Sequence, residues 1–193
     1  MTKVCISTPT KGTLRAETVQ WLLSEFVALA PHVRVDIVLE ARPLEHARNV
    51  QVARFLASDA THLFLLDSDC IPQPGTVARL LGWGLPFVAA PHPSVIDGET
   101  GLMVLERAEA GRYRQQQGLR GLVKADAVGC AGMLIRRDVL VALGPRWFRC
   151  RYGPDGLLDC GEDFDFCERL IAAGYDVWAD CDLAQRHVVP VVV

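Results

Sequence analysis

The chain has 193 residues, of which 50% are hydrophobic and 22% are charged, and its formal net charge is −3. This composition predicts one globular domain with a sizeable core, and the acidic balance argues against general binding to a nucleic-acid backbone, although a local basic patch is compatible with it. Seven scattered cysteines without a C-x-x-C pair favour reduced thiols in a cytoplasmic compartment. We see no signal peptide, and no apolar run reaches the ~18–20 residues of a transmembrane segment.

The first half of the chain alternates between the two periodicities of regular structure. Strands are expected at Val4–Ser7, Val33–Leu39 and Leu63–Leu66, with turn-forming residues at Thr8–Gly12. The helix after the first strand has an apolar stripe of Val19, Leu22, Leu23, Phe26 and Ala30, and the next helix starts at Pro43 with Ala47, Val50, Ala53 and Ala57. This order predicts a largely parallel α/β sheet with helices on both faces, and ligands bind such sheets beyond the carboxyl ends of the strands.

The second half is less regular. The expected elements are a short helix at Val77–Leu81, a strand at Pro86–Ala90, a polar hairpin or loop at Asp97–Gln117, an apolar strand with close backbone approach at Ala127–Ile135, a helix from Arg136 to Leu143, an aromatic loop at Trp147–Asp159, a helix from Gly161 with Phe166, Cys167, Leu170 and Ile171 as its buried stripe, and a strand at Val177–Ala179. No repeat or linker interrupts the chain, so one domain is the simplest organisation.

Two carboxylates follow the apolar strand at Leu63–Leu66. Asp67 and Asp69 are spaced i, i+2, which in a strand places both side chains on one side. Hard oxygen ligands of this kind suit Mg²⁺ or Mn²⁺, which keep open positions for substrate phosphates. The alternative is a turn or capping role, since Asp is common where a strand becomes a loop. The apolar run and a second acidic group downstream favour a clamp for a metal and a diphosphate.

The second acidic group is Glu162–Asp163, at the predicted start of a helix. The helix dipole alone favours carboxylates there, but one of them can also accept a proton from an incoming hydroxyl while the other orients an acceptor. We expect Asp165 to pair with Arg169 on the exposed face of the helix. A lone histidine such as His187 is more often a surface or core residue, yet imidazole also binds Mn²⁺ and similar ions.

Other candidate residues carry two interpretations each. Arg48 and Asn49 either face solvent on an amphipathic helix or contact a nucleotide base or ribose. Trp147 and Phe148 belong either to the core or to a stacking platform for a flat acceptor. The arginines between Arg107 and Arg120 form a solvated loop or face an anionic acceptor.

Taken in order and spacing, these motifs resemble those of glycosyltransferases of the GT-A fold, most closely the family 2-like enzymes. The resemblance runs over nearly the whole chain. It is carried by Ile6–Thr10, Ala47–Asn49, Leu65–Asp69, Val128–Arg136, Gly161–Cys167, Gly174–Tyr175 and His187.

The resemblance implies a single GT-A (Rossmann-like) α/β domain over residues 1–193, with a mixed, mostly parallel sheet, a nucleotide-binding half at 1–85 and an acceptor and catalytic half at 86–193. It also implies a nucleotide-sugar donor, UDP- or GDP-linked, and Mn²⁺ or Mg²⁺. The implied donor-binding residues are Thr8, Pro9, Arg48, Asn49, Asp67 and Ser68. The implied metal ligands are Asp67, Asp69 and His187.

The same resemblance matches Asp163 to the general base of inverting members, with Glu162 supporting the acceptor and Trp147 and Phe148 facing it. It leaves open whether the acceptor is a glycan, a lipid, a protein or a hydroxylated nucleobase in DNA, and whether the reaction inverts or retains. At this length we expect no appended acceptor domain or membrane anchor.

Three rival classes share part of the pattern. A haloacid-dehalogenase-type phosphatase also ends an apolar strand in D-x-D, but on its first strand and with Thr or Val where Ile71 stands here. A sugar-phosphate nucleotidyltransferase needs a glycine-rich loop where this chain has only Gly12. A non-catalytic nucleotide-sugar binding module would not need Asp163.

Overall fold

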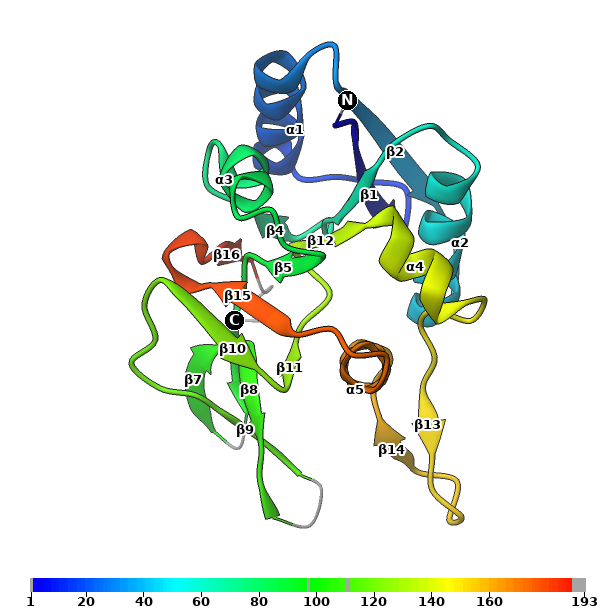
Figure 1. Cartoon of the computed structure of the whole chain (residues 1–193), viewed down its shortest axis with the longest axis vertical. Coiled ribbons are helices and arrows are strands. Elements are labelled where there is room, and N and C mark those ends of the chain that lie inside the picture. The colour runs from blue at the N-terminus through cyan, green and yellow to red at the C-terminus, as the bar shows by residue number, and fades with distance from the viewer. Residues whose placement is uncertain (1, 97, 110–111, 189–193) are drawn as a thin grey trace.

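The computed structural model describes residues 2–96, 98–109 and 112–188 (Figure 1). The helices are α1 (Ala16–Leu29), α2 (Leu44–Leu56), α3 (Thr76–Gly82), α4 (Arg137–Leu143), α5 (Glu162–Ala172) and the short 3-10 helix η2 (Cys181–Leu183). The central strands are β1 (Val4–Thr10), β2 (Val33–Leu39), β3 (His62–Leu65), β5 (Phe87–Ala89), β10 (Leu122–Ala125), β12 (Met133–Arg136) and β15 (Val177–Asp180). The other strands are β4 (Cys70–Ile71), β6 (Pro93–Ile96), β7 (Glu99–Leu102), β8 (Val104–Arg107), β9 (Tyr113–Gln115), β11 (Ala127–Val128), β13 (Arg151–Tyr152), β14 (Leu158–Cys160) and β16 (Arg186–His187).

The seven central strands pair in the order β10-β15-β5-β12-β3-β1-β2. β1 is parallel to β2 and β3, and β5 is parallel to β15. β12 is antiparallel to both β3 and β5, so β5 has the direction of β1, and β10 is antiparallel to β15. Five of the seven strands therefore run in one direction, which confirms the predicted mixed, mostly parallel sheet.

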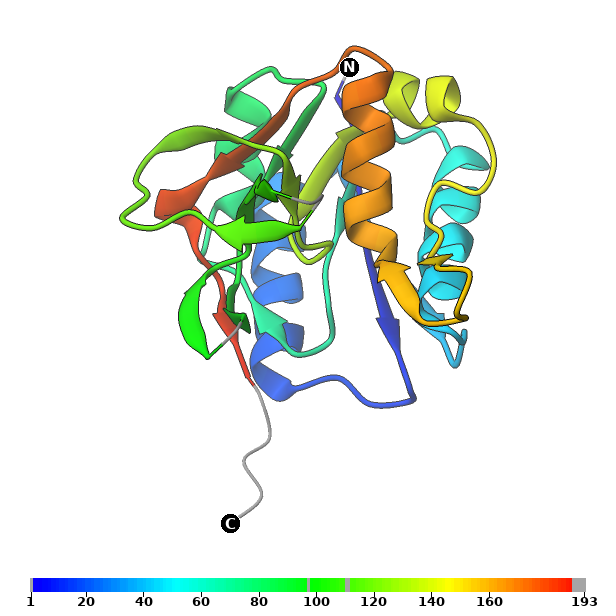
Figure 2. The ribbon, with the colours of Figure 1, turned by 90° about the horizontal axis from the view of Figure 1, so that it is seen from below.

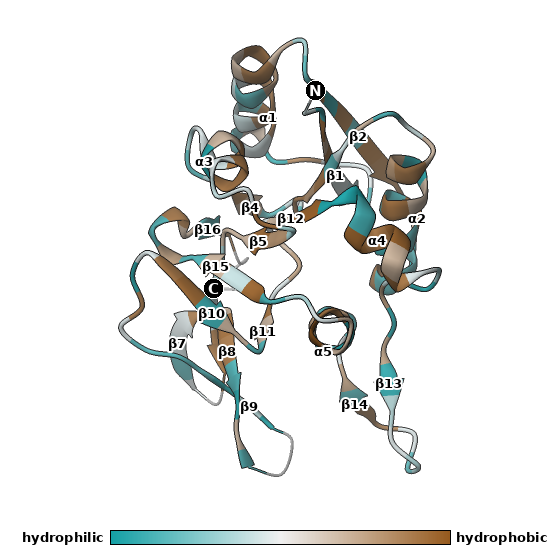
Figure 3. Cartoon of the chain, viewed as in Figure 1, coloured by the Kyte–Doolittle hydropathy of each residue, from teal (hydrophilic) through white to brown (hydrophobic). Residues whose placement is uncertain are grey.

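The sheet separates two hydrophobic cores. Alternate residues of one strand face opposite sides, so Leu63 and Leu65 join the core beneath α2, α4 and α5, whereas Phe64 and Leu66 join the core beneath α1 and α3. Figure 2 shows this sandwich from below, with α1 on one side and α2 and α5 on the other. Brown, apolar segments follow the buried strands in Figure 3. In the part of the chain described here, the helices are all too short or too polar to cross a bilayer.

The first strand is longer than the sequence predicted. β1 continues through Pro9 to Thr10 because β2 pairs with it along its whole length, whereas β3 pairs with it only as far as Ser7. Pro9 lacks a backbone N–H, and a proline is tolerated in a strand where no neighbour needs that donor. The expected loop therefore begins after Thr10, and the end of β1 projects past β3.

The buried face of α1 also differs from the predicted apolar stripe. The buried residues are Thr18, Trp21, Leu22 and Glu25, while Val19, Leu23 and Phe26 are exposed. Trp21 Nε1 donates to the Gln73 carbonyl at 3.0 Å, and a Glu25 carboxylate oxygen accepts from Gly75 N at 2.6 Å. The inner face of α1 is thus occupied in part by side chains that form hydrogen bonds with backbone groups of the loop before α3. Apolar periodicity alone does not predict such hydrogen bonds.

The segment expected as one strand at Ala127–Ile135 is divided into β11 and β12 by a turn at Gly129–Gly132. The predicted close approach is real at Gly132, which has φ +90° and would place a Cβ 2.2 Å from the Ala90 carbonyl oxygen. Gly132 N donates to Leu65 O and its carbonyl accepts from Ala90 N, at 2.7 and 3.0 Å. In the polar segment expected at Asp97–Gln117, β8 and β9 form an antiparallel hairpin, and Asp97 lies outside the described residues.

Replacing Gly132 with alanine tests this close approach. At Gly84, which has φ +64° with open space around it, a Gly84→Ala change costs only the left-handed backbone, about 1–2 kcal/mol. Gly132→Ala adds overpacking of about 1–3 kcal/mol. Urea unfolding should therefore show a larger loss for Gly132→Ala, and equal losses would contradict the close approach.

Candidate functional site

A cavity of about 560 Å³ lies beyond the carboxyl ends of β1 and β3, within the size range of small-molecule sites. It is lined by Pro9, Thr10, Lys11, Thr13, Ala41, Arg42, Pro43, Leu44, Ala47, Asp67, Ser68 and Asp69. Pro9, Ser68 and the two aspartates were predicted from the sequence to lie here. Lys11 and Arg42 were not, because a single basic residue in a polar loop carries no distinguishing signal.

The two aspartates lie in a turn and not in a strand. β3 ends at Leu65, and Cys70 N donates to Asp67 O at 3.1 Å, which closes a turn over residues 67–70. The argument from strand alternation is therefore wrong in detail, although both side chains do line the cavity. The turn gives them different partners, since Asp67 meets Arg48 and Asp69 meets His187.

Arg48 forms an ion pair with Asp67 from a fully buried position on α2. The Arg48 side chain is 0% exposed, and that of Asp67 is 28% exposed. Burial alone would lower the pKa of Arg48, but Asp67 outweighs burial and the pKa is raised. A buried hydrogen-bond chain runs on from Arg48 through Gln51 to Ser7 (3.2 Å each). Arg48 is thus held behind Asp67 and does not reach a nucleotide, which corrects its predicted role.

Asn49 and Phe148 are joined by two hydrogen bonds. Asn49 Nδ2 donates to Phe148 O at 2.6 Å and Phe148 N donates to Asn49 Oδ1 at 3.1 Å. The Phe148 ring is 1% exposed and stacks on Phe166, with centroids 4.5 Å apart. Trp147 Nε1 donates to Leu140 O at 2.7 Å and the side chain packs against the same core. Phe148 is therefore a core residue in this structure, whereas Trp147 is only partly buried, so its predicted place near an acceptor stays a prediction.

Thr8 was predicted to lie near a nucleotide base. The structure buries it completely, in contrast to Pro9, which lines the cavity. Within the described residues the Thr8 hydroxyl has no hydrogen-bond partner. Thr8 therefore lies inside the end of β1 and supports the cavity wall without forming its surface.

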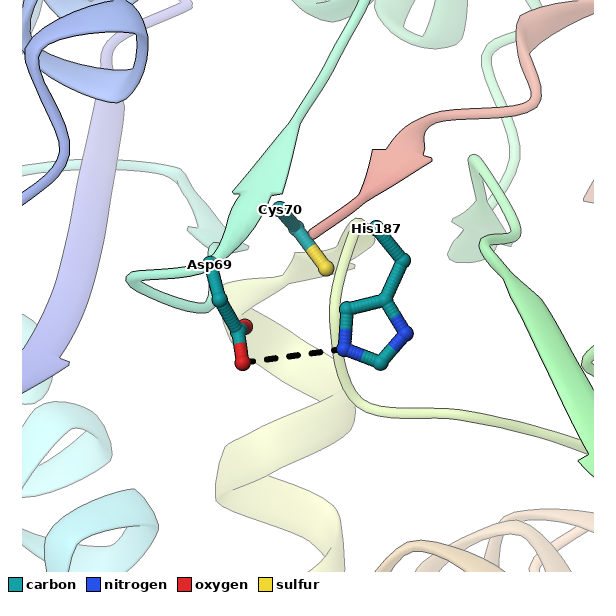
Figure 4. A group of neighbouring side chains, drawn as sticks. All are labelled: Asp69, Cys70 and His187. Atoms are coloured by element: carbon teal, nitrogen blue, oxygen red, sulfur yellow. Dashed lines mark ion pairs between the residues drawn. The ribbon is translucent and has the colours of Figure 1, made fainter. Parts of the chain in front are cut away.

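A short strand pair brings His187 to the aspartate turn. β4 and β16 are antiparallel, and His187 lies opposite Cys70. His187 Nε2 is 3.6 Å from Asp69 Oδ2, and the donor atoms of Asp69, Cys70 and His187 all lie within 4.8 Å of one another. Figure 4 shows the three side chains converging from the two strands. The structure thus unites Asp69 with His187 and adds Cys70, while Asp67 stands outside this group.

The hydrogen bond of His187 Nδ1 determines which of the two ring nitrogens carries the proton. His187 Nδ1 is 3.2 Å from the Pro93 carbonyl oxygen, which can only accept a hydrogen bond. In the neutral ring Nδ1 therefore holds the proton, and Nε2 presents a lone pair toward the Asp69 carboxylate. Two hydrogen-bond acceptors that face each other at 3.6 Å can hold a cation between them. In metal sites, the ring nitrogen of a histidine that does not bind the metal usually donates a hydrogen bond to a carbonyl or carboxylate, as Nδ1 does here.

His92 is a neighbour that sequence reasoning missed. Its ring contacts that of His187 edge-on at a centroid distance of 4.9 Å, and its Nδ1 is 3.1 Å from the same Pro93 carbonyl oxygen. Burial lowers the pKa of His92, so the ring is held neutral. The position of His92 after β5 carries no sequence signal, because its role depends on the pairing of β4 with β16.

The start of α5 supplies a carboxyl group that can exchange a proton near neutral pH. Glu162 and Asp163 occupy the first turn of α5. Burial, and then the charge of Glu162, raise the pKa of Asp163 to about 7. Arg48 acts electrostatically on both Asp163 and Glu162 as well as on Asp67. The guanidinium that pairs with Asp67 therefore also acts on the acidic motif at the start of α5.

Asp165 pairs with Arg169, as its spacing suggested, but it is buried and does not lie on the exposed face of α5. It is 0% exposed and accepts hydrogen bonds from Arg149 at 3.0 Å and Arg151 at 3.1 Å, with Arg169 3.9 Å away. Arg151 belongs to β13. Asp165 therefore fastens the β13–β14 hairpin to α5, close to the catalytic candidates but not among them.

No family model matches the chain, and no curated protein matches it. Solved structures do match over nearly all of it. A197 from STIV has 16% sequence identity and a TM-score of 0.66, with coverage of 97% of this chain and 86% of that one. S. aureus TarS 1-349 in complex with UDP-GlcNAc has 11% identity and a TM-score of 0.60 (99% and 60%).

GalNAc-T7, whose structure was determined with UDP, GalNAc and Mn²⁺, has 12% identity and a TM-score of 0.58, with coverage of 98% of this chain and 44% of that one. The chain thus spans less than two thirds of GalNAc-T7 and TarS. At these identities the likeness concerns the fold, and it shows that the chain has the GT-A glycosyltransferase fold.

The buried pair on α2 predicts an asymmetry between two substitutions. Asp67→Asn leaves the fully buried Arg48 charge without its counter-ion, and such a loss costs about 3–5 kcal/mol. Arg48→Met replaces a buried charge with an apolar chain of similar length and leaves Asp67 partly in contact with water, so it should cost less. Urea unfolding of both variants checks this order, and the reverse order would contradict the buried pair.

Proposed function

We propose that the chain is a metal-dependent glycosyltransferase that moves a sugar from a nucleotide-sugar donor to an acceptor hydroxyl. One observation carries the proposal: Asp67 and Asp69 line the cavity, His187 faces Asp69, and Arg48, the counter-ion of Asp67, acts electrostatically on Asp163, although these residues lie on segments far apart in the sequence. The fold is shared with proteins solved with UDP, GalNAc and Mn²⁺ or with UDP-GlcNAc.

The cavity is the proposed donor site. All the residues that line it lie between Pro9 and Asp69, which supports assigning nucleotide binding to residues 1–85. Lys11 and Arg42 offer positive charge to a diphosphate, while Pro9 and Ser68 offer surface to the nucleoside. Arg48, Asn49 and Thr8 support this surface from behind. The donor is a UDP- or GDP-sugar in this proposal.

The divalent ion, Mn²⁺ or Mg²⁺, would be held by Asp69 and His187, with Asp67 beside Asp69 in the cavity wall. When bound, such an ion neutralises negative charge that develops on a departing diphosphate. The facing acceptor atoms of Asp69 and His187 fit this role without rearrangement of the backbone, because the β4–β16 pair and the turn at residues 67–70 already fix both residues.

Asp163 is the proposed general base, and Glu162 is proposed to orient the acceptor. With a pKa of about 7, the Asp163 carboxylate can take the proton of an acceptor hydroxyl as that oxygen attacks the sugar. In this proposal, residues 86–193 bind the acceptor and carry out catalysis, and the reaction inverts the configuration at the anomeric carbon of the sugar. Any hydroxyl of a glycan, a lipid, a protein or a modified nucleobase satisfies this chemistry.

Two of the rival classes fit the geometry less well. A phosphatase of the haloacid-dehalogenase type needs a free aspartate nucleophile, whereas Asp67 is tied to Arg48 and the turn follows the third strand along the chain. A module that only binds nucleotide sugars needs no buried carboxyl group that titrates near neutral pH, as Asp163 does.

The role of Asp163 predicts both a rate and a pH profile. Asp163→Asn should lower turnover about 10²–10⁴-fold, because that is the usual contribution of a general base. Donor affinity should change little, since Asp163 does not line the cavity. In the wild type, kcat/KM should rise with pH through about 7, because a carboxyl group whose pKa is raised to that value is protonated and inactive below it.

The matched control is Asp176→Asn, because Asp176 is an exposed aspartate that pairs with Lys124. This variant should keep the wild-type rate and profile. Sugar transfer and donor hydrolysis by each variant, followed from pH 5 to 9 together with calorimetric donor affinity, are the measurements. Parallel losses of donor affinity and turnover in Asp163→Asn would refute the base assignment.

The ion site predicts that nucleotide-sugar binding depends on metal through Asp69. In a thermal-shift screen of UDP-, GDP- and dTDP-sugars, one donor with Mn²⁺ should raise the melting temperature, since stabilisation grows with ligand concentration over Kd. Asp69→Ala should abolish the metal-dependent part of that rise. Asp59→Ala, which changes an exposed aspartate preceding β3, should leave it intact. An unchanged Mn²⁺-dependent affinity in Asp69→Ala would rule out the site.

A further inference from the structure

We infer that the ion site contains a sulfur ligand: the thiol of Cys70 joins Asp69 and His187, so that the site binds Zn²⁺ and Co²⁺ more tightly than Mg²⁺. This inference rests on the ion site of the proposed function but not on sugar transfer. Neither the spacing of the two aspartates nor the position of His187 in the sequence points to Cys70.

The geometry of the β4–β16 pair directs Cys70 toward the other two ligands. Cys70 and His187 lie opposite each other on antiparallel strands, where facing side chains are near neighbours. Asp69 directly precedes Cys70, and Val188 N donates to Asp69 O at 2.9 Å, which holds the end of the turn against β16. Figure 4 shows the sulfur pointing toward the space beside the His187 ring and the Asp69 carboxylate.

The distances fit a small ion with three protein ligands. Zinc–ligand bonds of about 2.0 Å to N and O and 2.3 Å to S place tetrahedral ligand atoms roughly 3.3–3.7 Å apart. The observed separation of His187 Nε2 and Asp69 Oδ2 is 3.6 Å, and all three donor atoms lie within 4.8 Å of one another. Side-chain adjustments of about 1 Å therefore complete the set, and a fourth position remains open, as in zinc sites that bind substrate.

The chemistry of the donor set determines which ion is preferred. A carboxylate and an imidazole accept several divalent ions, but thiolates select softer ions such as Zn²⁺, while Mg²⁺ requires oxygen ligands. Affinity for a mixed site of this kind rises in the order Mn²⁺, Co²⁺, Zn²⁺. When the ion binds, the S–H bond of Cys70 breaks, the sulfur–metal bond forms and the proton leaves to solvent, with no change of oxidation state.

Cobalt reports on the sulfur ligand directly. Titration of the full chain with Co²⁺ alone, in the absence of a nucleotide sugar, should produce a near-ultraviolet sulfur-to-cobalt charge-transfer band with one equivalent bound. Cys70→Ser should lose this band, and its affinity for Co²⁺ and Zn²⁺ should fall at least about 10–100-fold, since loss of an outer-shell partner alone costs that much. Affinity for Mg²⁺ should change little.

The matched control is Cys181→Ser, because Cys181 is also a buried thiol but lies on η2. It should retain the band. Circular dichroism confirms that each variant is folded, and X-ray absorption at the zinc edge of the wild type needs no variant at all: one sulfur neighbour at about 2.3 Å is expected.

Three outcomes would overturn the inference. These are Co²⁺ binding without the charge-transfer band, a band that persists in Cys70→Ser, and a zinc spectrum with only oxygen and nitrogen neighbours. The first and third outcomes are compatible with an ion held by Asp69 and His187, so the proposed transferase would survive them, whereas the second would place the ion at another thiol. Conversely, a sulfur-ligated ion in a protein that binds no nucleotide sugar would refute the transferase and keep the sulfur ligand.

Discussion

The arrangement of the site depends on one buried guanidinium. Arg48 is fully buried, yet it carries a charge that needs a counter-ion, and the turn at residues 67–70 provides it through Asp67. The same guanidinium acts on Glu162 and Asp163 at the start of α5. An arginine in this position fixes one acidic motif and lies near the other, so moving α2 would disturb both. One buried charge thus acts on two carboxylate motifs that lie almost a hundred positions apart in the sequence.

The environment of each carboxylate separates their roles. Asp67 is neutralised by Arg48, Asp69 faces a histidine lone pair, and Asp163 is buried beside a like charge that raises its pKa to about 7. A carboxylate that is already paired is a poor proton acceptor, whereas one with a pKa near the working pH is a good one. The proposed division into structural anchor, ion ligand and base therefore rests on burial and neighbours and not on residue type.

Sequence periodicity predicted the strands and helices around the site well, because β3, α3 and α4 bury faces that their apolar residues define. It failed where a polar side chain satisfies a distant backbone group. Asn49 binds the backbone of Phe148, 99 positions away, and Glu25 binds Gly75. It also missed Cys70 and His92, since both acquire their neighbours from a two-residue strand pair that no local pattern marks.

That strand pair is short, and it aligns the proposed ion ligands. β4 and β16 have two residues each, so a few backbone hydrogen bonds align His187 with Asp69 and Cys70. A bound ion would add three bonds across the same pair, and any group that binds only the folded arrangement stabilises it. In the proposed site, ion binding would therefore be coupled to the pairing of β4 with β16, and because Asp69 also lines the cavity, this coupling would extend to the proposed donor site.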